Sequence, residues 1–138
     1  MIGLRSLRLR DAADSVLRAA RFREPQRKSF DRVVAIVEAL YDDLPELSQP
    51  ELLDVLRGLG LPVDGDYPDF QFALATGVGK RRLMGAIGAY LIAGRQTNNV
   101  LILASRSAIL DKLEREIYPG SSDYLFLDPH LVPAPNVC

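Results

Sequence analysis

Two apolar runs, each followed by a helix-like stretch, limit what this chain of 138 residues can fold into. Residues 70–75 read FQFALA and residues 99–104 read NVLILA, and neither run contains a charged side chain. Short runs of this kind are typical of strands that are buried on both faces of a parallel sheet. The stretches 80–93 and 107–118 have helical patterns. The order strand, helix, strand, helix predicts an α/β fold with right-handed crossovers.

The first part of the chain has a helical pattern instead. Residues 11–21 repeat apolar side chains at helical spacing, and residues 30–40 do the same. Pro25 suits the first turn of the second helix, where its missing N–H costs little. Ser48 and Glu51 form a capping-box pattern ahead of a third apolar stretch. These segments predict a series of helices.

The two patterns divide the chain into two predicted parts. Residues 1–62 are expected to form a helical N-terminal segment. Residues 63–138 are expected to form the α/β part, with a third short strand at residues 124–127. Because complete sheets of this class have about five or six strands, the parallel sheet predicted here is incomplete.

Composition narrows the chemistry that the chain can perform. Its formal net charge of −1 creates no global field that would attract a nucleic acid or a membrane. The single cysteine, Cys138, and the single histidine, His130, exclude an internal disulfide and a zinc site built from such side chains. The sequence contains no run long enough to cross a bilayer, and its opening lacks the apolar core of a signal peptide. We therefore expect a cytoplasmic setting and no membrane partner.

The turn after the first expected strand reads Thr76-Gly77-Val78-Gly79-Lys80. Two glycines allow the backbone to curl, so that several N–H groups can face one anion. Lys80 supplies a positive charge, and the N-terminus of the following helix adds a partial one. The turn therefore predicts a phosphate-binding site, the alternative being a chance run of small residues.

Arg81 stands where such loops normally have threonine or serine. The hydroxyl of that residue ligates a magnesium ion that bridges the outer phosphates of the nucleotide. A guanidinium repels a cation but can pair with a phosphate oxygen. We therefore expect the loop to hold nucleotide while Mg²⁺ binding and hydrolysis are weakened. The alternative is that Arg81 swings out and water replaces the missing ligand.

Three motifs together resemble those of superfamily-two helicases and translocases. LATGVGKRRLMGAI, residues 74–87, resembles the phosphate-binding motif of these motors. FREPQRKSF, residues 22–30, resembles the helicase Q motif, and NNVLILASRSAILDKLEREI, residues 98–117, resembles the motif that touches the nucleic-acid backbone. Together these motifs resemble the N-terminal part of the restriction subunit of type III restriction enzymes and related DEAD/DEAH-box helicases. The resemblance covers most of residues 20–120.

The resemblance implies a RecA-like fold that binds ATP. Gly77, Gly79 and Lys80 would hold the phosphates, flanked by Thr76 and Val78, with Arg81 beside them. Gln26 would face adenine, because a carboxamide offers the donor and acceptor that match the edge of this base. The alternative for Gln26 is an exposed residue on a helix.

The resemblance also implies double-stranded DNA as a partner. Arg106 would contact a DNA phosphate, helped by Ser105 or Ser107. A modification (methyltransferase) subunit would be a further partner. The alternative for these three residues is a helix-capping serine beside a surface arginine.

The chain departs from the helicase pattern at a second place. Motors of this family need an Asp-Glu-x-His motif and a second RecA-like domain. The nearest candidate here is LFLDP, which ends in Asp128-Pro129 with proline where the glutamate is required. Asp128 is either a magnesium carboxylate or a turn former before proline. We therefore predict no catalytic and no metal-ligating residue.

These observations lead to one main hypothesis and two alternatives. The main hypothesis is an N-terminal fragment of an ATP-dependent DNA helicase or translocase of restriction type, with impaired hydrolysis. The first alternative is a non-catalytic nucleotide- or DNA-binding remnant that docks to a partner, since an incomplete sheet leaves an open edge. The second is a small phosphotransferase, which would need an arginine-bearing lid and an acceptor site that the acidic, proline-rich end does not offer.

Overall fold

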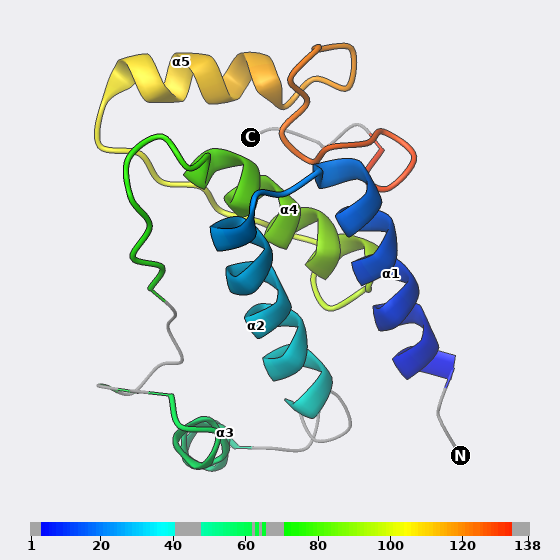
Figure 1. Ribbon diagram of the computed structural model, residues 1–138, viewed down its shortest axis with the longest axis vertical. Coiled ribbons are helices and arrows are strands. Elements are labelled where there is room, and N and C mark those ends of the chain that lie inside the picture. Colours follow the sequence, from blue (N-terminus) through cyan, green and yellow to red (C-terminus); the bar gives the residue numbers. More distant parts are fainter. Residues whose placement is uncertain (1–3, 41–47, 62, 64, 66–70, 134–138) are drawn as a thin grey trace.

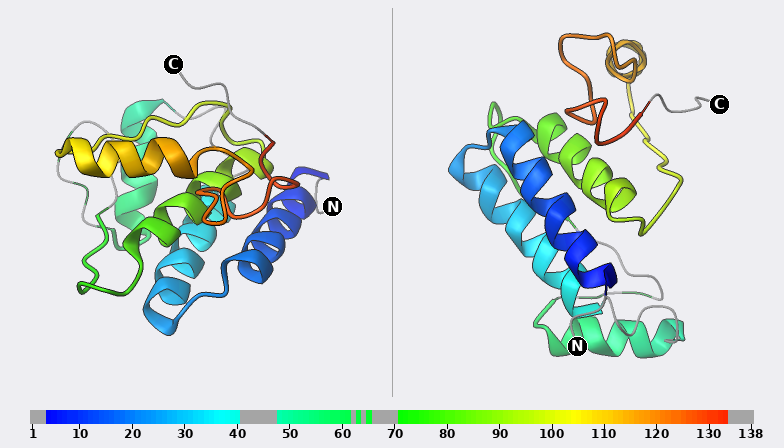
Figure 2. Two further views of the ribbon diagram at one scale, coloured as in Figure 1. Left: turned by 90° about the horizontal axis from the view of Figure 1, so that it is seen from above. Right: turned by 90° about the vertical axis from the view of Figure 1, so that its right-hand side faces the viewer.

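The structure, a computed structural model, describes residues 4–40, 48–61, 63, 65 and 71–133. Its regular elements within these ranges are five α-helices: α1 (Leu4–Ala20), α2 (Glu24–Leu40), α3 (Gln49–Gly58), α4 (Lys80–Ala93) and α5 (Ser107–Glu116). Helices α1, α2 and α4 lie beside one another in the middle of the molecule, whereas α5 and α3 lie at opposite ends (Figure 1). Figure 2 shows the same arrangement from two further sides.

The local signals that predict helices are confirmed. Pro25 lies in the first turn of α2. The capping box of α3 is formed, and the backbone N–H of Ser48 donates to a carboxylate oxygen of Glu51 at 2.7 Å. Hydrogen bonds from the hydroxyl and the backbone of Ser48 lower the pKa of Glu51. Helix α4 begins and ends as predicted, with Gly94 as its C-cap.

Helix α4 packs against both α1 and α2, so it is the centre of the main core. Aromatic rings line the contact with α2, where Phe30 and Tyr90 meet edge to face with ring centroids 5.6 Å apart. The hydroxyl of Tyr90 is buried and has no hydrogen-bond partner among the described residues. Burial, and to a lesser degree the nearby charge of Glu38, raise the pKa of Tyr90. The fully and largely buried residues of this core are Leu9, Ala12, Ala13, Val16, Phe30, Leu83, Ala86, Ala89, Tyr90, Leu113, Tyr124, Leu125, Phe126 and Val132.

The described residues form two hydrophobic cores of different size. The main core combines side chains of α1 and α2 with side chains of α4 and α5. A smaller second core joins the end of α2 to α3 and contains Ile36, Leu40, Leu53, Leu56 and Val63. Residue 62 lies outside the described residues, and the two-part division remains a prediction.

The expected α/β fold with an incomplete RecA-like parallel sheet is wrong. The described ranges contain no strand and no sheet. Residues 71–75 and 99–104 are irregular, and residues 100–104 form no hydrogen bond with any described residue. Residue 70, the start of the first expected strand, lies outside the described ranges. An apolar run favours a strand only when a neighbouring strand supplies ladder hydrogen bonds, and neither run has one.

The third expected strand, residues 124–127, consists of turns. The backbone N–H of Leu127 donates to the carbonyl of Tyr124 at 3.0 Å, and that of Asp128 donates to the carbonyl of Phe126 at 2.9 Å. Tyr124, Leu125 and Phe126 are nevertheless buried, because this segment packs on α4. The apolar character of the segment reflects this packing rather than a sheet.

None of the helices in the described part of the chain combines the length and the apolar character needed to cross a bilayer.

The close approach of the 124–127 segment to α4 gives a test of the packing. A Cβ atom added to Gly85 would overlap the carbonyl oxygen of Leu125. We expect Gly85→Ala to lower the free energy of unfolding by about 1–3 kcal/mol, because overpacking forces the backbone to shift. Gly58, which is also helical, has open space around its Cα. Gly58→Ala is therefore expected to raise stability by about 0.5–1 kcal/mol. Urea denaturation followed by circular dichroism measures the free energy of unfolding of both variants. Equal changes in the two variants would contradict the packing described here.

Candidate phosphate-binding site

The loop before α4 has the backbone conformation that its glycines predict. Gly77 has φ +84° and Gly79 has φ +80°, both in the left-handed region that side chains rarely adopt. Gly79 is the N-cap of α4, and Lys80 is the first helical residue. The loop therefore curls immediately before a helix N-terminus, which is where an anion is best held.

The groups that would contact an anion are free. No described residue accepts a hydrogen bond from the backbone N–H of Thr76, Gly77, Val78 or Gly79. The side chain of Lys80 is exposed and has no ion-pair partner within the described ranges. At a helix N-terminus the first N–H groups also lack partners inside the helix. The loop thus offers unpaired donors and one unpaired positive charge on a single short segment.

Gln26 lies next to this loop, as its predicted place in a nucleotide site requires, but it contacts the backbone. Its side-chain Nε2 donates to the carbonyl of Gly79 at 2.9 Å, and its Oε1 accepts from the backbone N–H of Arg23 at 2.9 Å. The residue is 3% exposed, which excludes the alternative of an exposed helix residue. Gln26 therefore ties the start of α2 to the loop. Its contact with adenine remains a prediction.

A second feature favours glycine at position 79. A Cβ atom there would overlap Nε2 of Gln26, so the glutamine would have to give up its present position. The left-handed backbone and the glutamine contact thus favour the same residue. The loop is held in its curled form by α2 as well as by its own sequence.

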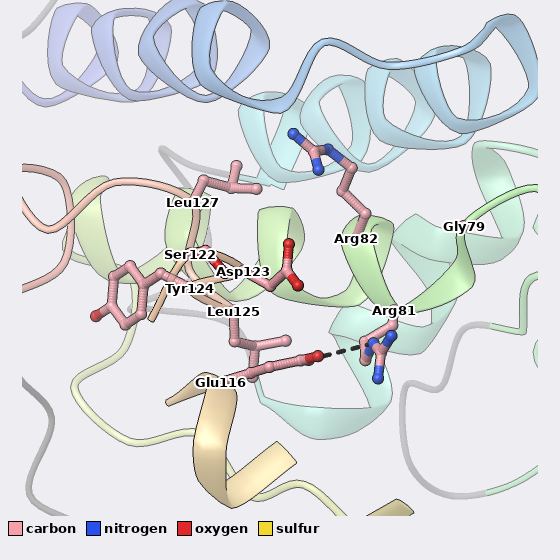
Figure 3. A pocket seen from close by; sticks show the side chains of 9 residues that line it. All are labelled: Gly79, Arg81, Arg82, Glu116, Ser122, Asp123, Tyr124, Leu125 and Leu127. Carbon is pink, nitrogen blue, oxygen red and sulfur yellow. Dashed lines mark ion pairs between the residues drawn. The ribbon is translucent and has the colours of Figure 1, made fainter. Parts of the chain in front are cut away.

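Arg81 forms an ion pair instead of pointing freely into solution. Its Nε lies 3.3 Å from Oε2 of Glu116, the last residue of α5 (Figure 3). Lys112 lies farther from the same carboxylate, with Nζ 4.0 Å from Oε1. Arg82 turns to the other side of α4, where its Nε donates to the carbonyl of Ala20. The charge of Arg81 is therefore compensated by a carboxylate, whereas the charge of Arg82 faces a neutral carbonyl.

A pocket of about 340 Å³ opens beside Gly79, between the first turn of α4, the end of α5 and the turns that follow α5. Its polar character comes from two arginines and two carboxylates. The sequence did not indicate Glu116 or Asp123, because only the folded chain brings α5 and the following turns to the loop. The lining residues are Gly79, Arg81, Arg82, Glu116, Ser122, Asp123, Tyr124, Leu125 and Leu127.

The residues at the loop do not fit a magnesium ion. Mg²⁺ prefers oxygen ligands, carboxylates above all, and the described residues contain no group of three or more side chains that could hold a metal ion. The carboxylate of Glu116 is already shared by two cations. Arg81 presents a positive charge at the position where a hydroxyl would be needed. The weakened Mg²⁺ binding stays a prediction of the sequence.

Asp128 takes part in a turn. Its Oδ1 accepts from the backbone N–H of His130 at 2.8 Å, and its carbonyl accepts from the backbone N–H groups of Leu131 and Val132. Such a bond from an aspartate side chain to the backbone two residues later defines an Asx turn. Of the two roles considered for Asp128, the structure thus shows the turn former. His130 is exposed.

The three residues predicted to contact DNA lie at the start of α5. Arg106 is its N-cap with an extended backbone, and Ser105 and Ser107 flank it. All three are exposed and have no hydrogen-bond or ion-pair partner from their side chains among the described residues. In the left view of Figure 2 this end of α5 is separated from the start of α4. The DNA contact remains a prediction for a surface distinct from the phosphate loop.

Comparisons with known protein families, with curated proteins and with solved structures found no match to this chain.

The role of Gln26 in holding the loop can be tested directly. Gln26→Ala removes a buried hydrogen bond to Gly79 and another to the backbone of Arg23. We expect the free energy of unfolding to fall by about 1–3 kcal/mol, because buried backbone groups lose their partners. The amide resonances of residues 76–80 in an NMR spectrum should shift as well, because the carbonyl of Gly79 loses its donor. Gln71→Ala, at an exposed glutamine, is the matched control and should change neither quantity. Unchanged resonances in the Gln26 variant would contradict the contact described here.

Proposed function

We propose that the chain binds the phosphates of a nucleotide at the loop Thr76–Lys80. The observation that carries this proposal is the pair of left-handed glycines, Gly77 and Gly79, directly before the first turn of α4. The unpaired N–H groups and the exposed Lys80 support it further. Phosphates are bound in this way at helix N-termini, because N–H groups and the helix dipole face the anion together.

ATP is the nucleotide that we propose, in the setting of a restriction-type DNA helicase or translocase. The support is the motif resemblance together with the placement of Gln26 against the loop. Double-stranded DNA at Ser105, Arg106 and Ser107, a modification subunit and a cytoplasmic setting belong to the same proposal. Hydrolysis would be impaired, because Arg81 occupies the position of the magnesium-binding hydroxyl.

The proposal predicts ATP binding that depends on Lys80 and not on Mg²⁺. Lys80→Ala removes a charge-assisted contact worth about 1.5–3 kcal/mol, so we expect the Kd to rise about tenfold or more. The Kd of the unmodified chain should be similar in Mg²⁺ and in EDTA, and turnover should be negligible. Titration with a fluorescent ATP analogue measures the Kd, and phosphate release measures turnover.

Lys28 provides the control for Lys80. It is an exposed lysine on α2 that pairs with Glu24 at 2.8 Å. Lys28→Ala should leave the Kd for ATP unchanged. Equal Kd values for the unmodified chain and the Lys80 variant, or sustained hydrolysis by the isolated chain, would refute the proposal.

A second candidate function is docking without catalysis, for which the segment 99–104 provides a specific observation. Leu101 is 83% exposed and Leu103 is 84% exposed. Ile102 and Ala104, which alternate with these leucines, pack against the main core. Residues 100–104 also have no backbone hydrogen bond within the described ranges. The side chains of this segment alternate between solvent and the core, and its backbone groups have no partner among the described residues. A segment of this kind can accept a strand from another chain.

We propose a second copy of this chain as the occupant of that segment. Its residues 71–75 form no hydrogen bond with described residues either, and Gln71, Phe72, Ala73 and Ala75 are exposed. In an antiparallel pair centred on Ala73 and Ile102, the exposed Phe72 would lie opposite the exposed Leu103. Aromatic and aliphatic side chains that face each other across paired strands favour this register.

Self-association is tested by changing the exposed leucines. The double variant Leu101→Ser, Leu103→Ser should sediment as a monomer at all concentrations, because the apolar area that the pair would bury is lost. The unmodified chain should show a sedimentation coefficient that rises with concentration. Tyr118→Ser removes another exposed apolar side chain, 66% exposed, and should not change this behaviour. A monomeric unmodified chain would contradict the proposal.

A further inference from the structure

The carboxylate of Glu116 is fixed, while its partner Arg81 is partly in solvent. The side chain of Glu116 is 8% exposed, and that of Arg81 is 39% exposed. The carbonyl of Glu116 accepts from the backbone N–H of Leu125 at 2.7 Å, which ties the end of α5 to the turns packed on α4. If the pair separates, the arginine is therefore the member that moves.

A buried carboxylate requires a positive partner. Leaving it alone is costly, because the charge has lost its water without compensation. Lys112, one turn earlier on α5, already lies 4.0 Å from the other oxygen of Glu116. Glu116 thus keeps a cation when Arg81 leaves.

Arg81 also lies within the first turn of α4, directly after the loop. Arg81 and Gly79 of the loop line the same pocket (Figure 3). A phosphate held by the loop would compete with Glu116 for this guanidinium. Arginine pairs well with phosphate oxygens, because its planar fork matches their geometry.

We propose that Glu116 is a positioning residue that sets the affinity of the loop for phosphate. In the free chain, Glu116 holds Arg81 away from the loop. When a nucleotide binds, Arg81 exchanges from Glu116 to an outer phosphate, and Lys112 neutralises Glu116. The specificity that results is for a ligand with several adjacent phosphates, which can occupy Lys80 and Arg81 together. This inference rests on the proposed nucleotide binding.

The test compares ATP binding by four forms of the full chain: unmodified, Glu116→Gln, Arg81→Gln and the double variant. Glu116→Gln keeps the shape of the side chain and removes its charge. We expect its Kd for ATP to be about 5- to 30-fold lower, a coupling of ordinary size between two groups. Arg81→Gln should cancel this gain, so that the double variant binds like Arg81→Gln alone. Glu114→Gln, which removes an exposed carboxylate from the same helix, is the matched control and should bind like the unmodified chain.

A second readout uses the unmodified chain and does not depend on any variant folding. The Nε–H resonance of Arg81 in an NMR spectrum should shift on saturation with ATP and should shift much less with AMP. A purely structural ion pair would leave this resonance in place. Circular dichroism confirms that each variant used for binding is folded.

The outcomes separate this inference from the proposed function. If Lys80→Ala loses ATP binding while Glu116→Gln binds like the unmodified chain and the Arg81 resonance does not move, the loop binds phosphate and the role of Glu116 is refuted. If no form binds ATP, Glu116→Gln included, both proposals fail. If Glu116→Gln is the only form that binds ATP, this result supports the inference, provided that adding Lys80→Ala to the variant abolishes the binding.

Discussion

The small side chains of α4 are the constraint on which the rest of the structure depends. Gly85 allows the backbone of Leu125 to approach the helix, and Gly88 allows the ring of Phe126 to lie against it. At the other end, Leu9 of α1 lies close to Gly94. Cores are packed densely, so a side chain of even one methyl group at such a contact requires a neighbour to shift. The position of α4 is fixed from several sides, and so is the loop that begins it.

The start of α4 is held by contacts of two kinds. Gln26 from α2 bonds to the carbonyl of Gly79, which fixes the backbone of the loop. Glu116 from α5 pairs with Arg81, which fixes a side chain. The first contact is between neutral groups and is buried, whereas the second includes a partly exposed cation. The backbone of the loop and the charge beside it are therefore held by separate contacts.

Local signals in the sequence were sufficient for the helices and for the loop. Helix α4 follows from its apolar pattern between Gly79, whose left-handed backbone begins the helix, and Gly94, which ends it with a right-handed backbone. The apolar run 99–104 led to a wrong prediction of a buried strand. Apolar side chains favour burial but do not supply a partner strand, and Leu101 and Leu103 are in fact exposed. Glu116 lay beyond prediction, because its role comes from where α5 packs. Geometry within a few residues can be predicted from sequence, whereas contacts between distant segments depend on the whole fold.

The charges around the loop favour an anion over a cation. Lys80, Arg81 and Arg82 are consecutive, and only Arg81 pairs with a carboxylate among the described residues. Arg82 bonds to a neutral carbonyl, so its charge is not cancelled. With the partial positive charge of the helix N-terminus, this end of α4 remains positive. A divalent cation would be repelled here, whereas the phosphates of a nucleotide would be attracted. Under the proposed function, Arg81 would therefore separate phosphate binding from metal-assisted hydrolysis, two properties that the usual form of this loop combines.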